Sequence, residues 1–166
     1  MKPNRTIAKK LVITYLVAFA GLAQAKSGEV GFNSCGAGEV LSSVEIAPQQ
    51  IISTSKYSGV TKSIPPGGLN DQLSFTCYGS TSTVGGPTVF SGHCVAVDKD
   101  GDKYAIRYLS APTGKSEIAG KSEVLGGSGK FAGMKGGSEY KGTRLPGIPG
   151  HFSVCSEGVL KYTLPD

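Results

Sequence analysis

Short runs of β-forming residues, separated by glycine- and proline-rich turns, limit the fold of this chain more than any other feature. Val, Ile, Thr, Tyr and Phe gather in these runs, 25 glycines are spread along the chain, and no long 3.6-residue period appears. The predicted strands cover about residues 38–46, 51–56, 73–83, 88–97, 103–109, 116–124, 138–145 and 152–163. Eight such runs suit a sandwich or a closed barrel, and the succession of hairpins favours an all-β, eight-stranded antiparallel up-and-down β-barrel.

The first 25 residues have the composition of an export signal. Basic residues precede an apolar run at 11–22, and a small-residue cleavage sequence follows at 23–25. We expect cleavage between Ala25 and Lys26, so that residues 1–25 are a signal peptide and residues 26–166 form a single barrel domain in the periplasm or outside the cell. An apolar run of about 12 residues is shorter than the roughly 20 that span a bilayer, and no cysteine follows the cut. No membrane anchor is expected.

The charge of the chain changes once the leader is set aside. The full chain carries a formal +5, but four of its 17 basic residues and none of its 12 acidic residues lie in the leader, which leaves 13 − 12 = +1. The remaining Lys and Arg are dispersed, so no surface for the phosphate backbone is predicted. Nucleic acid is therefore not expected as a partner.

Four cysteines, Cys35, Cys77, Cys94 and Cys155, form an even set in an exported chain, which predicts two structural disulfides. No CxxC spacing is present, so neither a zinc site nor a redox site is expected. A hairpin loop centred on residues 85–86 places Cys77 opposite Cys94, within reach of a disulfide. Cys35 then pairs with Cys155, which joins the first strand to the last.

The acidic segment Asp98–Asp102 predicts a hairpin turn. Its Asp-x-Asp-x-Asp spacing also resembles the start of a calcium-binding EF-hand loop. That loop needs a glycine at its sixth position and an acidic ligand at its twelfth, whereas this chain has Lys103 and Leu109 there. A hairpin without a metal is therefore expected.

Pairing Val97 with Tyr104 across this turn aligns the two flanking strands and turns the face of Val97 inward. The alignment predicts an inner row of one histidine between two tyrosines, beside an apolar wall. The predicted ligand-binding residues are Tyr78, His93, Tyr108, Tyr104 and Ile106. His93 is the candidate catalytic residue, because an imidazole between hydroxyls can shuttle a proton. The alternative is a core histidine that is hydrogen-bonded to the tyrosines and packed for stability.

Residues 125–137 form a glycine-rich segment with a single large side chain that can plug one end of a core. The run Gly-Gly-Ser-Gly-Lys-Phe, followed by Gly-x-x-Gly, is similar to the Gly-Gly-Thr-Gly-x-Phe segment of the allene oxide cyclase and dirigent superfamily, including exported bacterial members. The matching structural residues are Gly126, Gly127, Gly129, Phe131, Gly133 and Gly136. The resemblance covers about twelve residues. It implies an eight-stranded antiparallel barrel with a central cavity and transfers no catalytic residue.

These observations predict an exported small barrel that binds a small apolar ligand, or a partner, without catalysis and without a cofactor. The alternative is a cyclase or isomerase that acts on a lipid-like or phenolic substrate inside the barrel, as the resemblance to allene oxide cyclases implies. A third possibility is an interaction protein whose barrel is filled by side chains. The volume of the cavity separates the first two hypotheses from the third, and no oligomeric state is predicted.

Overall fold

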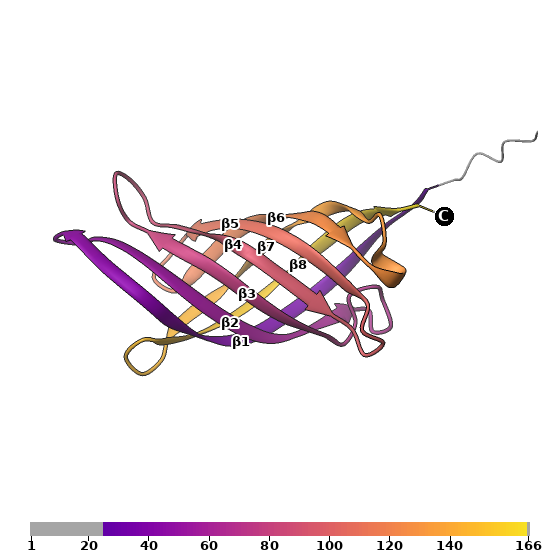
Figure 1. Ribbon diagram of the computed structural model, residues 1–166, viewed down its shortest axis with the longest axis horizontal. Helices are drawn as coiled ribbons and strands as arrows, with labels where there is room; N and C mark the ends of the chain where they lie inside the picture. Colours follow the sequence, from indigo (N-terminus) through magenta and orange to yellow (C-terminus); the bar gives the residue numbers. More distant parts are fainter. Residues whose placement is uncertain (1–24, 166) are drawn as a thin grey trace, which may run out of the picture.

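The eight strands of the chain close into one antiparallel barrel in sequence order, which confirms the predicted all-β, up-and-down fold (Figure 1). The computed structural model describes residues 25–165, so the predicted leader and its cleavage lie almost wholly outside the described residues. Within them, no helix is long and apolar enough to cross a membrane. The elements are β1 (Lys26–Ala47), β2 (Gln50–Ile64), β3 (Leu73–Ser82), β4 (Val89–Val97), β5 (Lys103–Pro112), β6 (Glu117–Gly127), the 3-10 helix η1 (Gly129–Phe131), β7 (Lys135–Pro146) and β8 (His151–Leu164).

The first two strands are longer than predicted, with 22 residues in β1 and 15 in β2. Their extra parts are rich in glycine and serine, which have low β propensity alone. Pairing on both edges of each strand overrides this propensity, because β1 bonds to both β2 and β8. A Cβ on Gly59 would lie 2.0 Å from the Cys35 carbonyl oxygen, so glycine is required where β1 and β2 approach closely.

One end of the barrel, which we call the plugged end, is filled by apolar side chains. The η1 helix follows β6 and carries Phe131, which is 0% exposed, into the barrel beside Tyr104. Gly129 (φ 58°) and Gly133 (φ 71°) adopt left-handed backbone on either side of it. The buried cluster comprises Val30, Leu73, Ala96, Tyr104, Val124, Phe131, Met134 and Leu160. The glycine-rich segment thus forms the predicted plug.

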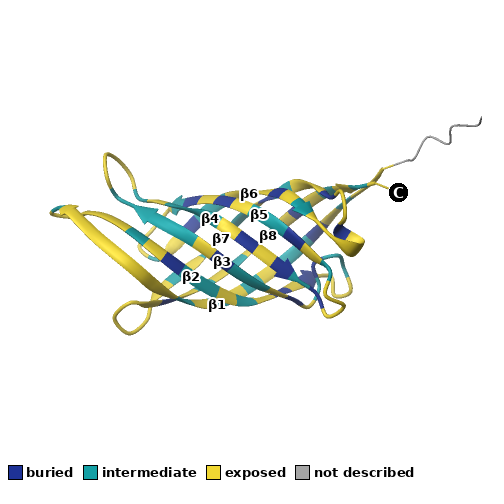
Figure 2. Cartoon of the chain, in the orientation of Figure 1, coloured by how far each residue is buried: buried dark blue, intermediate teal, exposed yellow. Residues whose placement is uncertain are grey.

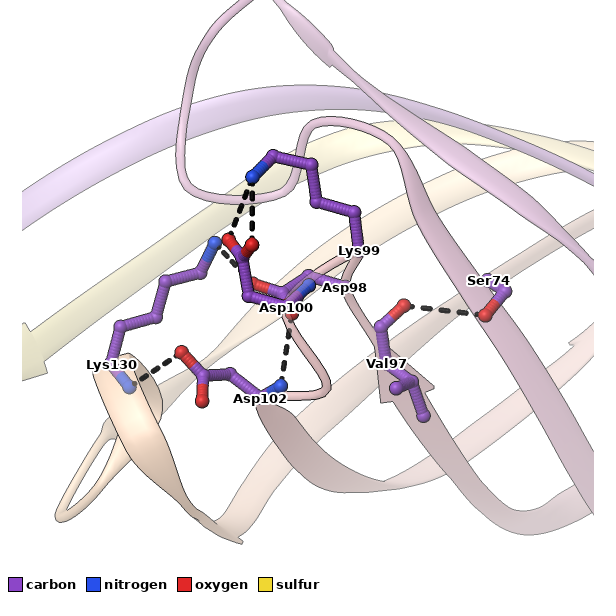
Figure 3. Close-up of polar contacts among 7 residues, drawn as sticks. All are labelled: Ser74, Val97, Asp98, Lys99, Asp100, Asp102 and Lys130. Atoms are coloured by element: carbon purple, nitrogen blue, oxygen red, sulfur yellow. Dashed lines mark hydrogen bonds and ion pairs between the residues drawn. The ribbon is translucent and has the colours of Figure 1, made fainter.

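The turn between β4 and β5 is fastened to this plug (Figure 3). Asp98, whose side chain is 2% exposed, forms an ion pair with Lys130 of η1 and accepts a bond from the Asp102 backbone N–H at 2.9 Å. Asp102 in turn accepts a bond from the Lys130 backbone N–H at 3.1 Å. The acidic segment therefore holds a hairpin turn against the plug.

Both predicted disulfides are confirmed. Cys77–Cys94 joins β3 to β4, and Cys35–Cys155 joins β1 to β8 where the barrel closes. The first is buried inside the barrel, whereas both cysteines of the second are exposed on its outer face. Successive side chains of a strand point to opposite faces, so buried and exposed residues alternate along the strands of the barrel (Figure 2).

The predicted register between β4 and β5 is wrong by one residue. The Asp98 backbone N–H bonds to the Asp102 carbonyl, and Val97 therefore faces Lys103 instead of Tyr104. A slip of one residue moves every side chain of a strand to the other face. Cys94 and Ala96 consequently point inward, and the predicted inward face of β4, which includes Val95 at 44% exposure, lies on the outside.

Candidate functional site

The other end of the barrel, which we call the mouth, is formed by the four turns that follow β1, β3, β5 and β7. A cavity of about 130 Å³ runs inside the barrel between the plugged end and the mouth. Aromatic rings, aliphatic side chains and hydroxyl groups line it, and Arg144 is the one charged residue in its lining within residues 25–165. The barrel is therefore plugged at one end and hollow toward the other.

Three tyrosines from different strands face one another in this cavity: Tyr57 of β2, Tyr108 of β5 and Tyr140 of β7. The rings of Tyr57 and Tyr108 meet edge to face, with centroids 6.2 Å apart. Tyr108 has room because Gly79 and Gly92 lie opposite it. A Cβ at these glycines would lie only 2.1 Å and 2.7 Å from its hydroxyl oxygen.

Burial raises the pKa of the phenols of Tyr57, Tyr108 and Tyr140 above the usual value of about 10. Repulsion between ionised phenols raises the pKa of Tyr57 and Tyr108 further, because neighbouring tyrosines would both carry negative charge. At neutral pH these groups are therefore neutral hydroxyls, which can both donate and accept hydrogen bonds.

Arg144 lies near the mouth end of β7, between two aromatic rings. Its guanidinium carbon is 3.8 Å from the centroid of Phe152 and 4.9 Å from that of Phe90. Burial lowers the pKa of the guanidinium from its very high ordinary value, and the nearby Tyr108 and Tyr57 oppose this change. Since arginine remains protonated at any physiological pH, the cavity contains a fixed positive charge.

Three of the five predicted ligand-binding residues line the cavity. Tyr104, Ile106 and Tyr108 alternate along β5 and face inward, as predicted. Their role in ligand binding remains a prediction. At the plugged end, the Tyr104 hydroxyl donates to Asn70 Oδ1 at 2.9 Å, and burial raises the pKa of this phenol.

The predicted positions of Tyr78 and His93 inside the barrel are wrong. The two residues do face each other across β3 and β4, but both are exposed on the outer surface, with Tyr78 56% exposed. The physical reason is the one-residue slip at the β4–β5 turn, which pairs His93 with the outward-facing Arg107. The predicted row of tyrosine, histidine and tyrosine is therefore broken, and His93 cannot act as a catalytic group in the cavity.

Three further residues that line the cavity, Tyr57, Tyr140 and Arg144, were not predicted from the sequence. A usable signal was present in β7, where Glu139 and Lys141 alternate with Tyr140. The two charged residues form exposed ion pairs with neighbouring strands, so the alternation turns Tyr140 and Arg144 inward. Tyr57 lies in the part of β2 that extends beyond the predicted strand.

No group of three or more His, Cys, Asp or Glu side chains within residues 25–165 is arranged to hold a metal ion. In the segment that resembles a calcium loop, Asp98 accepts bonds from backbone N–H groups at 2.8 and 2.9 Å and pairs with Lys130. The Asp98 carboxylate therefore binds backbone N–H groups of the turn and the Lys130 ammonium of the plug.

Comparisons with known proteins give a likeness in fold. A scan of protein-family models and a search of curated proteins returned no match. Among solved structures, the chain is similar to a pterocarpan synthase dirigent protein, with a TM-score of 0.55 and 10% sequence identity over 95% of this chain and 100% of that chain. At this identity the likeness shows the barrel fold alone. It agrees with the architecture that the glycine-rich segment implied.

Proposed function

We propose that this protein binds a small, largely apolar molecule inside its barrel and does not transform it. The observation that supports the proposal is the cavity of about 130 Å³ between the plug and the mouth. An engineered apolar cavity of about 150 Å³ holds benzene, so the space suits roughly one aromatic ring. Apolar walls with a few polar groups are typical of ligand pockets.

The chemistry of the lining favours binding over the alternative of a cyclase or isomerase. Among the described residues that line the cavity, none is an aspartate, glutamate or histidine. The lining tyrosines have raised pKa values, so they are poor general bases at neutral pH. The lining can hold and orient a molecule, but it offers little acid–base chemistry.

We further propose that the protein works outside the cytoplasm, in the periplasm or as a secreted protein, after removal of residues 1–25. Two disulfides fit an oxidising compartment. The intact mass of protein purified from its own source tests this proposal. A chain that begins at Lys26 and carries two disulfides is expected, and a mass that includes the leader would contradict it.

Binding can be measured by calorimetric titration with benzamide, a neutral probe with one ring. We expect saturable binding at one site and recovery of unchanged benzamide. Tyr108→Trp places extra volume inside the cavity and should abolish binding, whereas Tyr78→Trp makes the same change on the outer face and should leave binding intact. Absence of binding to the unaltered protein, or equal effects of the two substitutions, would refute the internal site.

A further inference from the structure

Arg144 is placed unlike the other cations whose contacts are described. Arg107, for example, lies on the outer face and pairs with Glu123, and both side chains are more than half exposed. Arg144 instead lines the cavity, and no ion pair among residues 25–165 includes it. Among the described residues, none that lines the cavity is acidic and could balance its charge. The interior of the barrel therefore has a net positive charge.

The aromatic contacts of Arg144 leave its guanidinium N–H donors without a protein acceptor among residues 25–165. Phe152 and Phe90 contact the guanidinium as cation–π partners, with the nearer ring centroid at 3.8 Å. Such contacts use the face of the planar group and fix its orientation. The N–H donors lie in the plane of the guanidinium, in a fork that matches the two oxygens of a carboxylate. An oriented guanidinium without a protein carboxylate is suited to bind an anion.

The surroundings of Arg144 restrict which anion fits. Tyr57 and Tyr108 are close enough to affect its pKa, and both are neutral hydroxyls that can donate to an anion. A single positive charge balances a single negative one. The remaining walls are largely aromatic and aliphatic, and the space is about 130 Å³. These features together favour one compact ring with one carboxylate.

We propose that the ligand is a small aromatic monocarboxylate and that Arg144 binds its carboxylate near the mouth, while the ring lies in the apolar part of the cavity. This inference rests on the proposed function, because it assigns the chemical class of the ligand in the same cavity. It also gives Arg144 a function, since an unpaired cation in a partly desolvated site is costly to retain.

The test compares benzoate with benzamide, which have nearly the same shape but differ in charge. In calorimetric titrations of the purified protein at pH 7, we expect benzoate to bind at least about tenfold more tightly, as a charge-assisted bidentate bond predicts. Equal affinity for the two probes would refute the inference but leave the proposed function intact. If neither probe binds, both the inference and the proposed function fail.

Two substitutions of Arg144 test whether this residue causes the tighter binding of benzoate. Arg144→Gln should reduce it to within about twofold, and Arg144→Lys, which keeps the charge but loses the planar fork, should retain an intermediate preference. Arg107→Gln is the matched control on the outer face and should keep the full preference. A full preference in Arg144→Gln would refute the role of Arg144. If Arg144→Gln does not fold, the ratio of the benzoate and benzamide affinities is compared between the unaltered protein and Arg144→Lys. An unchanged ratio in Arg144→Lys would then refute the role of Arg144.

Discussion

The two ends of this barrel are built from the same alternating strands but differ in what their connections do. At the plugged end, the segment after β6 folds inward, and Phe131 and Met134 are 0% and 2% exposed. At the mouth, apolar side chains extend into solvent from the last part of β1 and from the turn after β7, with Val44 63% and Ile148 71% exposed. Buried apolar contacts are therefore concentrated at the plugged end.

The two ends of the barrel also differ in their hydrogen bonds and ion pairs. At the plugged end, Asp71 accepts backbone N–H bonds from Ser63 at 3.2 Å and from Gly67 at 2.9 Å, which closes the loop between β2 and β3. The buried bond from Tyr104 to Asn70 fastens the same loop to β5. Near the mouth, Arg144 has aromatic contacts and no ion pair among the described residues. The polar groups of the plugged end are therefore joined to one another, whereas Arg144 at the mouth has no acidic partner among residues 25–165.

The largest effect is expected from Phe131→Ala. This change removes the fully buried ring of the plug, and replacement of a buried phenylalanine by alanine costs about 3–5 kcal/mol of unfolding free energy. Phe90→Ala provides the comparison at the mouth. It should cost less than about half as much, because the half-buried Phe90 already borders a cavity. Urea unfolding monitored by circular dichroism measures both, and equal losses would contradict the difference between the two ends.

A smaller loss is expected from Tyr104→Phe. The substitution removes the hydroxyl that bonds to Asn70, whose side chain is buried, and an unsatisfied buried acceptor costs about 1–3 kcal/mol. Tyr78→Phe is the control on the outer face and should leave the free energy of unfolding within about 0.5 kcal/mol. Equal stability of the two variants in urea would show that the loop between β2 and β3 does not depend on this bond.

The ion pair between Asp98 and Lys130 predicts that the free energy of unfolding depends on pH in the acidic range. The hydrogen bond from Lys130 is the main cause that lowers the pKa of Asp98 in the folded protein, and backbone N–H bonds add to it. A lowered folded pKa contributes stability above the unfolded value of about 3.9, and this contribution is lost as pH falls through the folded pKa. Urea midpoints measured from pH 7 to pH 2 should therefore fall less steeply in Asp98→Asn than in the unaltered protein. Identical pH profiles would contradict the role of Asp98.

The smallest effect concerns the phenols of the cavity. Since burial raises the pKa of Tyr108 and Tyr140, absorbance at alkaline pH should show phenols that ionise above the usual value of about 10. Tyr108→Phe and Tyr140→Phe should each remove one phenol from this late phase. Tyr57 and Tyr104 are also buried and keep a late phase in either variant, so the quantity compared is its amplitude. An unchanged amplitude in both variants would show that Tyr108 and Tyr140 are not desolvated.

Much of the barrel could be predicted because it depends on local pattern. The alternation along β5 placed Tyr104, Ile106 and Tyr108 inside, and a single hairpin register paired Cys77 with Cys94. The resemblance of the glycine-rich segment to the allene oxide cyclase and dirigent superfamily indicates the same fold independently of the strand pairing. These features need only the two-residue period of a strand and the geometry of one turn.

The candidate site could be predicted only in part, because it depends on the length of one turn. Gly101 takes a left-handed conformation (φ 86°) and Asp98 closes the turn on Asp102, so the strands align one residue away from the predicted register. His93 consequently lies outside. Arg144 was not predicted, because an isolated arginine in a strand usually faces solvent. The alternation of charged residues with Tyr140 in β7 indicates that Arg144 faces inward, and the closed barrel shows that it faces a cavity.

Amide chemical shifts during titration with benzoate test most directly whether the ligand site lies in the cavity, near the mouth. We expect saturable shifts at Phe90, Arg144 and Phe152, where the carboxylate is proposed to bind, and at Tyr57 and Tyr108 along the cavity wall. The amides of Phe131 and Met134 in the plug, and of Tyr78 and His93 on the outer face, should not move. Shifts confined to the outer face or to the plug, or no saturable shift at any concentration, would contradict the proposed site.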